Sequence, residues 1–361
     1  MALKTNTKIR VLIVDDSALM RKKIKEILEQ DPEIEVVAAA RDGEESIQKA
    51  RDTSPDVITM DVNMPRMDGI TALQHILYEN ICPVVMLSSL TQDGATTTFE
   101  ALELGAFDFV AKPGGTISLT LESVTRELIA KVKLAAKNGT MRKIRAHNNI
   151  IKQKQQLLSN PVKGKGYFAE ATKAVAIGVS TGGPQTLSEI IPLLPPDLDA
   201  AVFLVQHLPA NFTSSFANRL NQTAQMVFKE ADAGDLVETG HGYVGKGGYH
   251  LLLRQVLGAP LRLRLATKPE HLFMPSVDVM MEAVLEVFGK KTVGVLLTGM
   301  GDDGAESMVK IKKAGGITIA ESEESAIIYG MCGEAIARGG ASIVAPAHRI
   351  AEEIVRAVKL L

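Results

Sequence analysis

A chain of 361 residues is longer than the ~150 residues typical of one domain, which predicts two domains. Its 46% hydrophobic and 23% charged residues are the values of an ordinary soluble globular protein. Lys plus Arg (40) nearly balances Asp plus Glu (42), so no net basic charge predicts nucleic acid or an anionic membrane surface as a partner.

Two further features bear on the cellular compartment. No apolar run approaches the ~20 residues that span a bilayer, and the N-terminal residues turn charged before a signal-length apolar stretch forms. The two cysteines, Cys82 and Cys332, offer neither a disulfide framework nor a metal-binding spacing, which suits a reducing environment. We therefore expect a cytoplasmic protein with no direct membrane insertion.

The N-terminal part of the chain alternates apolar strand patterns with helical patterns, which is typical of the βαβ units of a parallel sheet. A helix-period segment at 17–30 separates the first two strands. The predicted strands cover residues 9–16, 34–40, 56–61, 82–89 and 107–113.

Five polar side chains lie where these strands end, namely Asp15, Asp16, Asp61, Ser88 and Lys112. The carboxyl ends of parallel strands share one edge of a sheet, where ligands collect. Three carboxylates at that edge would repel one another unless they shared a cation, and Mg²⁺ is the natural choice because it prefers oxygen ligands. Each Asp could instead simply cap the following helix, but that explanation serves poorly for all five positions.

Residues 8–128 thereby resemble the receiver domain of bacterial response regulators. The resemblance implies a flavodoxin-like fold with strand order 2-1-3-4-5. It implies that Asp61 accepts phosphate from a histidine kinase, and that Mg²⁺ is held by Asp15, Asp16, Asp61 and the backbone carbonyl of Asn63. Ser88 and Phe109 match the switch positions that respond to the phosphate, and Lys112 matches the lysine that contacts it.

Residues 129–172 are basic, poor in strand patterns and end in Gly, Pro and Lys, which predicts a helix tail followed by a linker. Strand–helix alternation resumes at 173 and continues to 361, so we predict a second α/β domain there, doubly wound around a mainly parallel sheet. A glycine-rich stretch at 234–255 interrupts it and suggests a β-hairpin excursion.

The segment at 174–185, AVAIGVSTGGPQ, is an apolar strand that ends in a serine. Gly178 to Gly182 fits G-x-S-x-G, the turn that exposes a nucleophilic serine in α/β-hydrolases. A dinucleotide loop and a phosphate loop are both excluded, because the required second glycine and the Gly-Lys-Ser/Thr are missing. Ser180 is therefore a candidate nucleophile that needs a base.

His207 ends the apolar run at 200–207 and should lie at the same strand edge as Ser180. Its Nε2 atom is expected to take the serine proton, while a carboxylate accepts from Nδ1–H. That carboxylate is Asp302 or Asp303, which follow another apolar strand, and spacing alone does not choose between them. The chain order Ser, His, Asp differs from the Ser, Asp, His order of α/β-hydrolases.

Nearly the whole chain resembles the chemotaxis protein-glutamate methylesterase (CheB) family, in the blocks IGVSTGGP, VQHLPANFTSSFANRL, PSVDVMM, LLTGMGDDGAESM and GMCGEAIARGGA. The resemblance implies hydrolysis of glutamyl γ-methyl esters, and deamidation of specific glutamines, on chemotaxis receptors after phosphorylation of Asp61. It implies Ser180 as nucleophile, His207 as base and Asp303 as the carboxylate, with the backbone N–H groups of Thr181 and Met300 as oxyanion-hole candidates. Mg²⁺ belongs to the receiver, and the esterase step needs no cofactor.

Three positions depart from the family pattern: Gly245-Lys246 stands in place of Ala-Pro, Met274 in place of Arg and Cys332 in place of Pro. All lie outside the expected triad. The rival hypothesis is a non-catalytic adaptor, in which a receiver joined to a degenerate α/β domain binds chemoreceptors or the kinase without chemistry. An intact triad argues against it.

Overall fold

The computed structural model describes residues 8–112, 121–138 and 169–361, without the side chains of four helical residues, 92, 121, 123 and 138. The described residues fall into two compact units, one ending at 138 and the other beginning at 169. Helix α5 includes residues 129–138, the start of the predicted linker. Residues 139–168 lie outside the described residues, so the domain limits 8–128 and 173–361 stay predictions.

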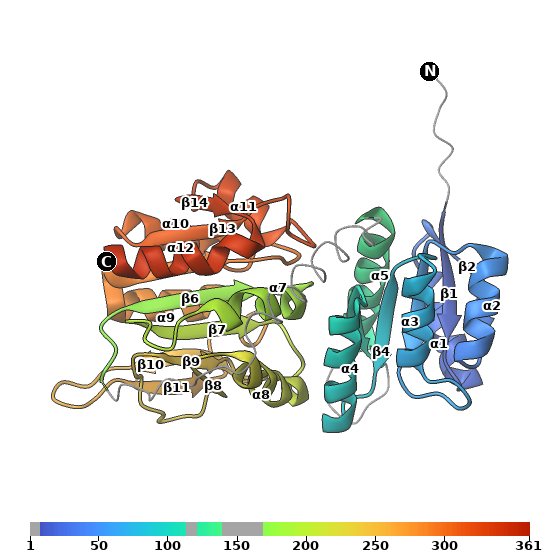
Figure 1. Ribbon diagram of the computed structural model, residues 1–361, viewed down its shortest axis with the longest axis horizontal. Coiled ribbons are helices and arrows are strands. Elements are labelled where there is room, and N and C mark those ends of the chain that lie inside the picture. Colours follow the sequence, from blue (N-terminus) through green and yellow to red (C-terminus); the bar gives the residue numbers. More distant parts are fainter. Residues whose placement is uncertain (1–7, 113–120, 139–168) are drawn as a thin grey trace, which may run out of the picture. The chain divides into compact units, whose positions relative to one another are not determined.

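The N-terminal unit is a parallel five-stranded sheet in the order β2-β1-β3-β4-β5, flanked by helices (Figure 1). This confirms the predicted flavodoxin-like order. The strands are β1 (Ile9–Val14), β2 (Ile34–Ala40), β3 (Val57–Asp61), β4 (Val84–Ser88) and β5 (Asp108–Ala111). The helices are α1 (Ala18–Leu28), α2 (Gly43–Thr53), α3 (Gly69–Tyr78), α4 (Gln92–Leu104) and α5 (Leu121–Asn138).

Side-chain caps begin four of these helices. Ser17, Asp42, Asp68 and Thr91 each accept a hydrogen bond from a backbone N–H of the first turn of α1, α2, α3 and α4. Asp15 and Asp61 are not among these caps, so capping does not account for their positions. The central strands are buried on both faces, which is why they read as continuous apolar runs.

The C-terminal unit contains a seven-stranded sheet in the order β14-β13-β12-β6-β7-β9-β8, in which every described pairing is parallel. Its strands are β6 (Ala174–Val179), β7 (Ala201–Gln206), β8 (Val227–Glu230), β9 (His241–Val244), β12 (Thr292–Leu296), β13 (Ile317–Glu321) and β14 (Ile343–Ala345). A separate antiparallel pair consists of β10 (His250–Arg254) and β11 (Arg262–Ala266).

The predicted excursion at 234–255 is therefore only partly a hairpin. Its second half, β10, pairs antiparallel with β11, but its first half, β9, enters the main sheet between β7 and β8, parallel to both. The alternation of side chains along a strand is the same in either direction, so the pattern could not distinguish the two pairings.

Helices cover both faces of the seven-stranded sheet. The α-helices are α7 (Gly183–Ile190), α8 (Thr213–Thr223), α9 (Val277–Phe288), α10 (Ala305–Lys313), α11 (Met331–Ala337) and α12 (Ala347–Leu360). Short 3₁₀ turns are η1 (Ile191–Leu193), η2 (Ala210–Phe212) and η3 (Gly289–Lys291). Helices α9 and α10 pack together on one face, and α7 and α12 pack together on the other.

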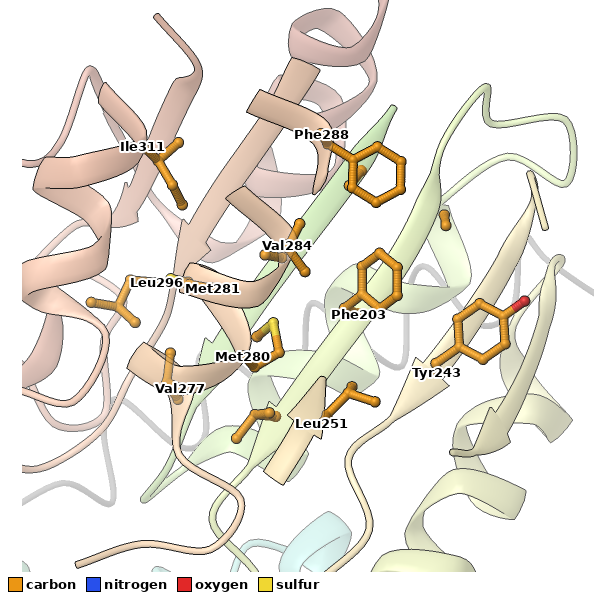
Figure 2. Packing of buried hydrophobic residues seen from close by; sticks show 14 of the residues in the cluster. Phe203, Tyr243, Leu251, Val277, Met280, Met281, Val284, Phe288, Leu296 and Ile311 are labelled. Carbon is orange, nitrogen blue, oxygen red and sulfur yellow. The ribbon is translucent and has the colours of Figure 1, made fainter. Parts of the chain in front are cut away.

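A hydrophobic cluster lies between α9 and the sheet (Figure 2). Phe203 of β7 stacks on Tyr243 of β9, with ring centroids 5.8 Å apart, and Phe288 of α9 closes over Phe203 at 6.1 Å. Alternate residues of β7 face this cluster, as a strand requires. The packing holds the first turn of α9 against the carboxyl ends of β6 and β12, where the polar residues gather.

Candidate active site and phosphorylation site

Three adjacent strands deliver the predicted triad to one edge of the sheet. Ser180 follows β6, His207 follows β7, and Asp303 lies in the loop after β12, which pairs with the other side of β6. His207 Nδ1 is 3.1 Å from Ser180 Oγ, and His207 Nε2 is 2.8 Å from Asp303 Oδ2. The structure thus brings together all three residues that the sequence singled out.

The orientation of the imidazole is the reverse of the predicted one. Nδ1, not Nε2, faces Ser180, and Nε2 faces Asp303. His207 directly follows β7, so its ring starts close to the neighbouring strand end, and the nearer nitrogen reaches the serine while the farther one extends to Asp303. Because the carboxylate can only accept, Nε2 carries the proton and Nδ1 is free to receive the proton of the serine hydroxyl.

Asp303 is buried and holds four hydrogen bonds. Besides His207, its donors are the hydroxyl of Ser276, at 2.9 Å, and the backbone N–H groups of Val277 and Asp278, at 2.8 and 2.9 Å. Burial opposes ionisation, but the hydrogen bond and charge of His207 and the two N–H groups outweigh it, and the pKa of Asp303 falls to about 2. The carboxylate is anionic at neutral pH and sits at the positive N-terminal end of α9.

Asp302, the alternative carboxylate, points elsewhere. It is exposed and forms an ion pair with Arg338, at 2.6 Å. Gly301 and Gly304, which flank the acidic pair, both have positive φ, at 86° and 95°. These left-handed turns orient the two neighbouring side chains differently, which spacing in the sequence could not reveal.

The turn that carries Ser180 is held by backbone hydrogen bonds and by the side chain of Gln206. Ser180 N–H donates to the Thr298 carbonyl, at 3.0 Å, and the Ser180 carbonyl accepts from the Gln206 amide, at 2.9 Å. Gly182 follows with φ of 80°, and α7 begins at Gly183. The serine is therefore half-buried at a fixed strand-to-helix turn.

Thr298 links this turn to the loop after β12. Its buried hydroxyl donates to the Thr181 carbonyl and accepts from the Ile328 N–H, each at 2.9 Å. Its own N–H donates to the buried carboxylate of Glu321, at 2.8 Å. Two residues later, Met300 is exposed at 41%.

The oxyanion-hole assignment to Thr181 and Met300 stays a prediction, with one supporting observation. Among the described residues, no hydrogen bond uses the backbone N–H of either residue, so both donors are available to a ligand oxygen. Unused donors of this kind, on loops tied together by Thr298, suit the charge that develops on a tetrahedral intermediate.

Several residues of the site were not predicted individually. Ser276 belongs to the block PSVDVMM, and its position before an apolar helical run marks it as the cap of α9. His271 lies in the segment before Ser276, with Nε2 3.9 Å from Asp303 Oδ1. No sequence pattern marks Gln206 or Thr298 as part of the site, because their side chains bind backbone groups of turns that are distant in the sequence.

The departures from the family pattern have local structural settings. Gly245 is buried, and a side chain there would meet Pro275 at 3.1 Å and Val205 at 3.2 Å. Lys246 pairs with Asp232 at 2.9 Å. Cys332 is buried and its thiol donates to the Leu296 carbonyl, at 3.2 Å, while burial raises its pKa. The cysteine is thus a packing residue and not a reactive thiol.

The N-terminal unit brings its predicted acidic residues together as well. Asp15, Asp16 and Asp61 each offer an oxygen within 4.8 Å of the others. Lys112 Nζ bridges two of them, at 2.8 Å from Asp15 and 2.7 Å from Asp61. Burial raises the pKa of Asp61, and Lys112 only partly offsets it. Three hard oxygen donors at a common point, with one of them costly to ionise, fit a divalent cation such as Mg²⁺.

The other predicted receiver residues lie on or beside strands β3, β4 and β5. Asn63 N–H lies 3.4 Å from Asp61 Oδ1. Ser88 is buried at the end of β4 and accepts a hydrogen bond from Thr98 of α4, at 2.6 Å. Phe109 is buried beneath the ammonium of Lys131, which lies 5.2 Å from the ring centroid. Their roles as magnesium ligand and switch residues stay predictions.

Comparisons with known proteins cover both units. The family model described as CheB methylesterase matches residues 175–354, and the model described as response regulator receiver domain matches residues 11–122. No helix in the described part of the chain combines the length and apolar character that crossing a bilayer requires.

Full-length relatives carry one consistent name. The chain is 58% identical to "Protein-glutamate methylesterase/protein-glutamine glutaminase 3" of Syntrophomonas wolfei, over 97% of this chain and 99% of the relative. It is 52% identical to the second such protein of Carboxydothermus hydrogenoformans, over 98% of this chain and all of the relative. The solved catalytic domain of Thermotoga maritima CheB methylesterase is 39% identical, with a TM-score of 0.50, and covers 51% of this chain and 97% of that domain.

Proposed function

The chain belongs to the CheB methylesterase family, and on this basis we propose that it hydrolyses glutamate γ-methyl esters, and deamidates specific glutamines, on chemotaxis receptors in the cytoplasm. The observation that carries the chemical part of the proposal is the unbroken chain of contacts from Ser180 through His207 to Asp303. A non-catalytic adaptor would have no need for a nucleophile, a base and a buried carboxylate in this geometry.

The first half of the reaction forms an acyl-enzyme. Ser180 Oγ attacks the ester carbonyl while His207 Nδ1 takes its proton, and the N–H groups of Thr181 and Met300 stabilise the oxyanion. The tetrahedral intermediate then breaks its bond to the methoxy oxygen. His207 Nδ1 returns the proton to that oxygen, and methanol leaves. With a glutamine substrate the same step releases ammonia.

The second half regenerates the enzyme. Water attacks the acyl carbonyl as His207 Nδ1 accepts one of its protons, and collapse of this intermediate returns the proton to Ser180 Oγ. The product is a glutamate side chain. Asp303 stabilises the imidazolium in both halves without taking up a proton, because four donors already occupy its oxygens.

We further propose that phosphorylation of Asp61 by a chemotaxis histidine kinase activates the esterase. When bound, Mg²⁺ at Asp15, Asp16, Asp61 and the Asn63 carbonyl would neutralise the charge of the carboxylates and the arriving phosphoryl group. Lys112 already contacts Asp61 and is placed to pair with a phosphoryl oxygen. Ser88 and Phe109 are the residues through which the change would spread.

The test measures methanol release from receptor-containing membranes with radiolabelled glutamyl methyl esters. Ser180→Ala and His207→Gln should lose nearly all activity while melting like the wild type. Near-normal release by a folded Ser180→Ala protein would rule out the proposed nucleophile. A small phosphodonor with Mg²⁺ should stimulate the wild type and not Asp61→Asn, and equal rates for the two would rule out the proposed regulation.

A further inference from the structure

We propose that Phe273 is a positioning residue of the esterase, which holds the imidazole of His207 in the plane that joins Ser180 to Asp303. The inference rests on the proposed role of His207 as the base. The two rings lie face to face, with centroids 3.9 Å apart and an angle of 10° between their planes. His207 has a side chain only 7% exposed, and Phe273 is half-buried.

The hydrogen bonds of His207 restrain one motion of its ring less than the others. Both bonds, to Ser180 and to Asp303, hold nitrogen atoms at the edge of the ring, so they resist sliding of the ring more than a small rotation about the Cβ–Cγ bond. A flat aromatic neighbour resists that rotation, because tilting the imidazole drives its edge into the phenyl face. Offset-stacked aromatic pairs typically favour one arrangement by about two- to tenfold.

The segment that carries Phe273 is itself anchored on both sides. It connects β11 to α9, and the buried His250 side chain spans it: Nε2 donates to the Pro269 carbonyl, at 2.9 Å, and Nδ1 accepts from Ser276 N–H, at 3.2 Å. Phe273 N–H donates to His271 Nδ1, at 3.2 Å. The phenyl ring is therefore presented by a braced loop.

The same segment also orients the carboxylate. Ser276, three residues after Phe273, donates its hydroxyl to Asp303, and Val277 adds its N–H. One stretch of chain between β11 and α9 thus holds both partners of the proton relay, the imidazole by its face and the carboxylate by its oxygens. Because one segment makes both contacts, a shift of this segment would move the imidazole of His207 and the carboxylate of Asp303 together.

Core packing does not account for Phe273. It is absent from the hydrophobic cluster beneath α9, to which Val277, the first residue of α9, belongs. Its neighbour Leu272 is 80% exposed and so provides a matched control. A phenyl ring at the rim of the site, spread over an imidazole, is suited to fixing that imidazole and keeping water off its face.

The experiment distinguishes the effect of the flat aromatic ring of Phe273 from the effect of its size. Phe273→Leu keeps an apolar side chain of similar size but removes the flat ring, Phe273→Tyr keeps the ring, and Leu272→Ala alters the exposed neighbour. For each variant we would measure kcat and KM for methanol release from labelled receptor membranes. The rate of Ser180 modification by a small fluorophosphonate and the melting temperature complete the set.

We expect Phe273→Leu to lose about two- to tenfold in kcat and a similar factor in fluorophosphonate reactivity, with KM unchanged, since misplacing a base affects the chemical step. Phe273→Tyr should keep both kcat and fluorophosphonate reactivity near the wild-type values, and Leu272→Ala should behave as the wild type. Full kcat in Phe273→Leu, or equal losses in Phe273→Leu and Phe273→Tyr, would overturn the proposal. Ser180→Ala, measured in parallel, tests the proposed function separately.

Discussion

The Nδ1 atom of His207 lies 3.1 Å from the Ser180 hydroxyl, and the opposite nitrogen of the ring is bound to Asp303. In the Ser-His-Asp arrangement of chymotrypsin the two nitrogens have the reverse assignment. The chemistry is unchanged, because either nitrogen can act as base once the other carries the proton. What matters is that the carboxylate selects the tautomer, and Asp303 is bound firmly enough to do so.

Replacing Asp303 by Asn should abolish most of the activity. The Asn amide would offer only one acceptor to four donors and would no longer fix the tautomer of His207, so kcat should fall about 10⁴-fold. Methanol release under saturating substrate measures this. Asp302→Asn is the matched control, since Asp302 pairs only with exposed groups, and it should retain full activity. A similar loss in both variants would contradict the assignment of the carboxylate.

The stability contributed by Asp303 should depend on pH. Its pKa falls from an ordinary 3.8 to about 2 on folding, which corresponds to about 2 kcal/mol. Because the folded-state pKa is the lower one, the contribution is present above pH ~4 and is lost as the pH falls towards ~2. Urea unfolding of the wild type and Asp303→Asn should differ more at pH 6 than at pH 3. A difference independent of pH would argue against an ionised, hydrogen-bonded Asp303.

Thr298→Val should impair catalysis without removing any group that touches the substrate. The change leaves the buried Thr181 carbonyl and Ile328 N–H without this partner, which costs about 1–3 kcal/mol in the free energy of unfolding. It also frees the turn that presents the Thr181 N–H, so kcat should fall while KM holds. Thr298→Ser keeps the hydroxyl and should retain most of the stability and kcat, and equal losses in Thr298→Val and Thr298→Ser would contradict the role of the hydroxyl.

Gly178→Ala should disturb the catalytic triad indirectly, by displacing Val277. A β-carbon at this position would lie 2.2 Å from Cγ1 of Val277, whose N–H binds Asp303. We expect a loss of about 1–3 kcal/mol from overpacking, together with reduced kcat. Val277→Ala should relieve part of the clash in the double variant. Calorimetric unfolding of the four proteins in a double-mutant cycle measures the coupling, and strictly additive effects would contradict the predicted contact.

The receiver should be stabilised by Mg²⁺ and, without it, by Asp61→Asn. Burial raises the pKa of Asp61 in the folded state, so keeping it ionised at pH 7 opposes folding, and the amide removes that penalty. In scanning calorimetry of the full chain, millimolar Mg²⁺ should raise the melting temperature of the wild type. It should have little effect on Asp15→Asn, which lacks one of the clustered oxygens. Equal magnesium responses would place the cation elsewhere.

The sequence predicted which residues gather at each sheet edge but not how they are oriented. Ser180, His207 and Asp61 follow apolar strands, and parallel topology alone brings such positions to a common edge. The choice of Asp303 over Asp302 depends on backbone angles at Gly301 and Gly304, which the letters GDDG do not encode.

Other parts of the site depend on contacts between distant segments. Thr298 is tied to Thr181, 117 residues earlier, and to Ile328, 30 residues later, and nothing local in the sequence marks such a residue. Ser276 is an intermediate case, because its role as a helix cap is predictable whereas its bond to Asp303 is not. The parallel pairing of β9 also depends on distant segments, because the direction of a strand in a sheet is set by the strands with which it pairs, here β7 and β8.

The two glycines on either side of Ser180, which complete the G-x-S-x-G pattern, are each required by packing in this domain. Gly178 is small because Val277 occupies the space beside it, and Gly182 combines a φ of 80° with the close approach of Ile327, 2.7 Å from where its β-carbon would be. Each constraint comes from a neighbouring side chain of this domain. A search by pattern alone would group this enzyme with hydrolases whose partner residues follow another chain order, so the likeness in G-x-S-x-G reflects a shared need for room around a serine and is no evidence of common descent.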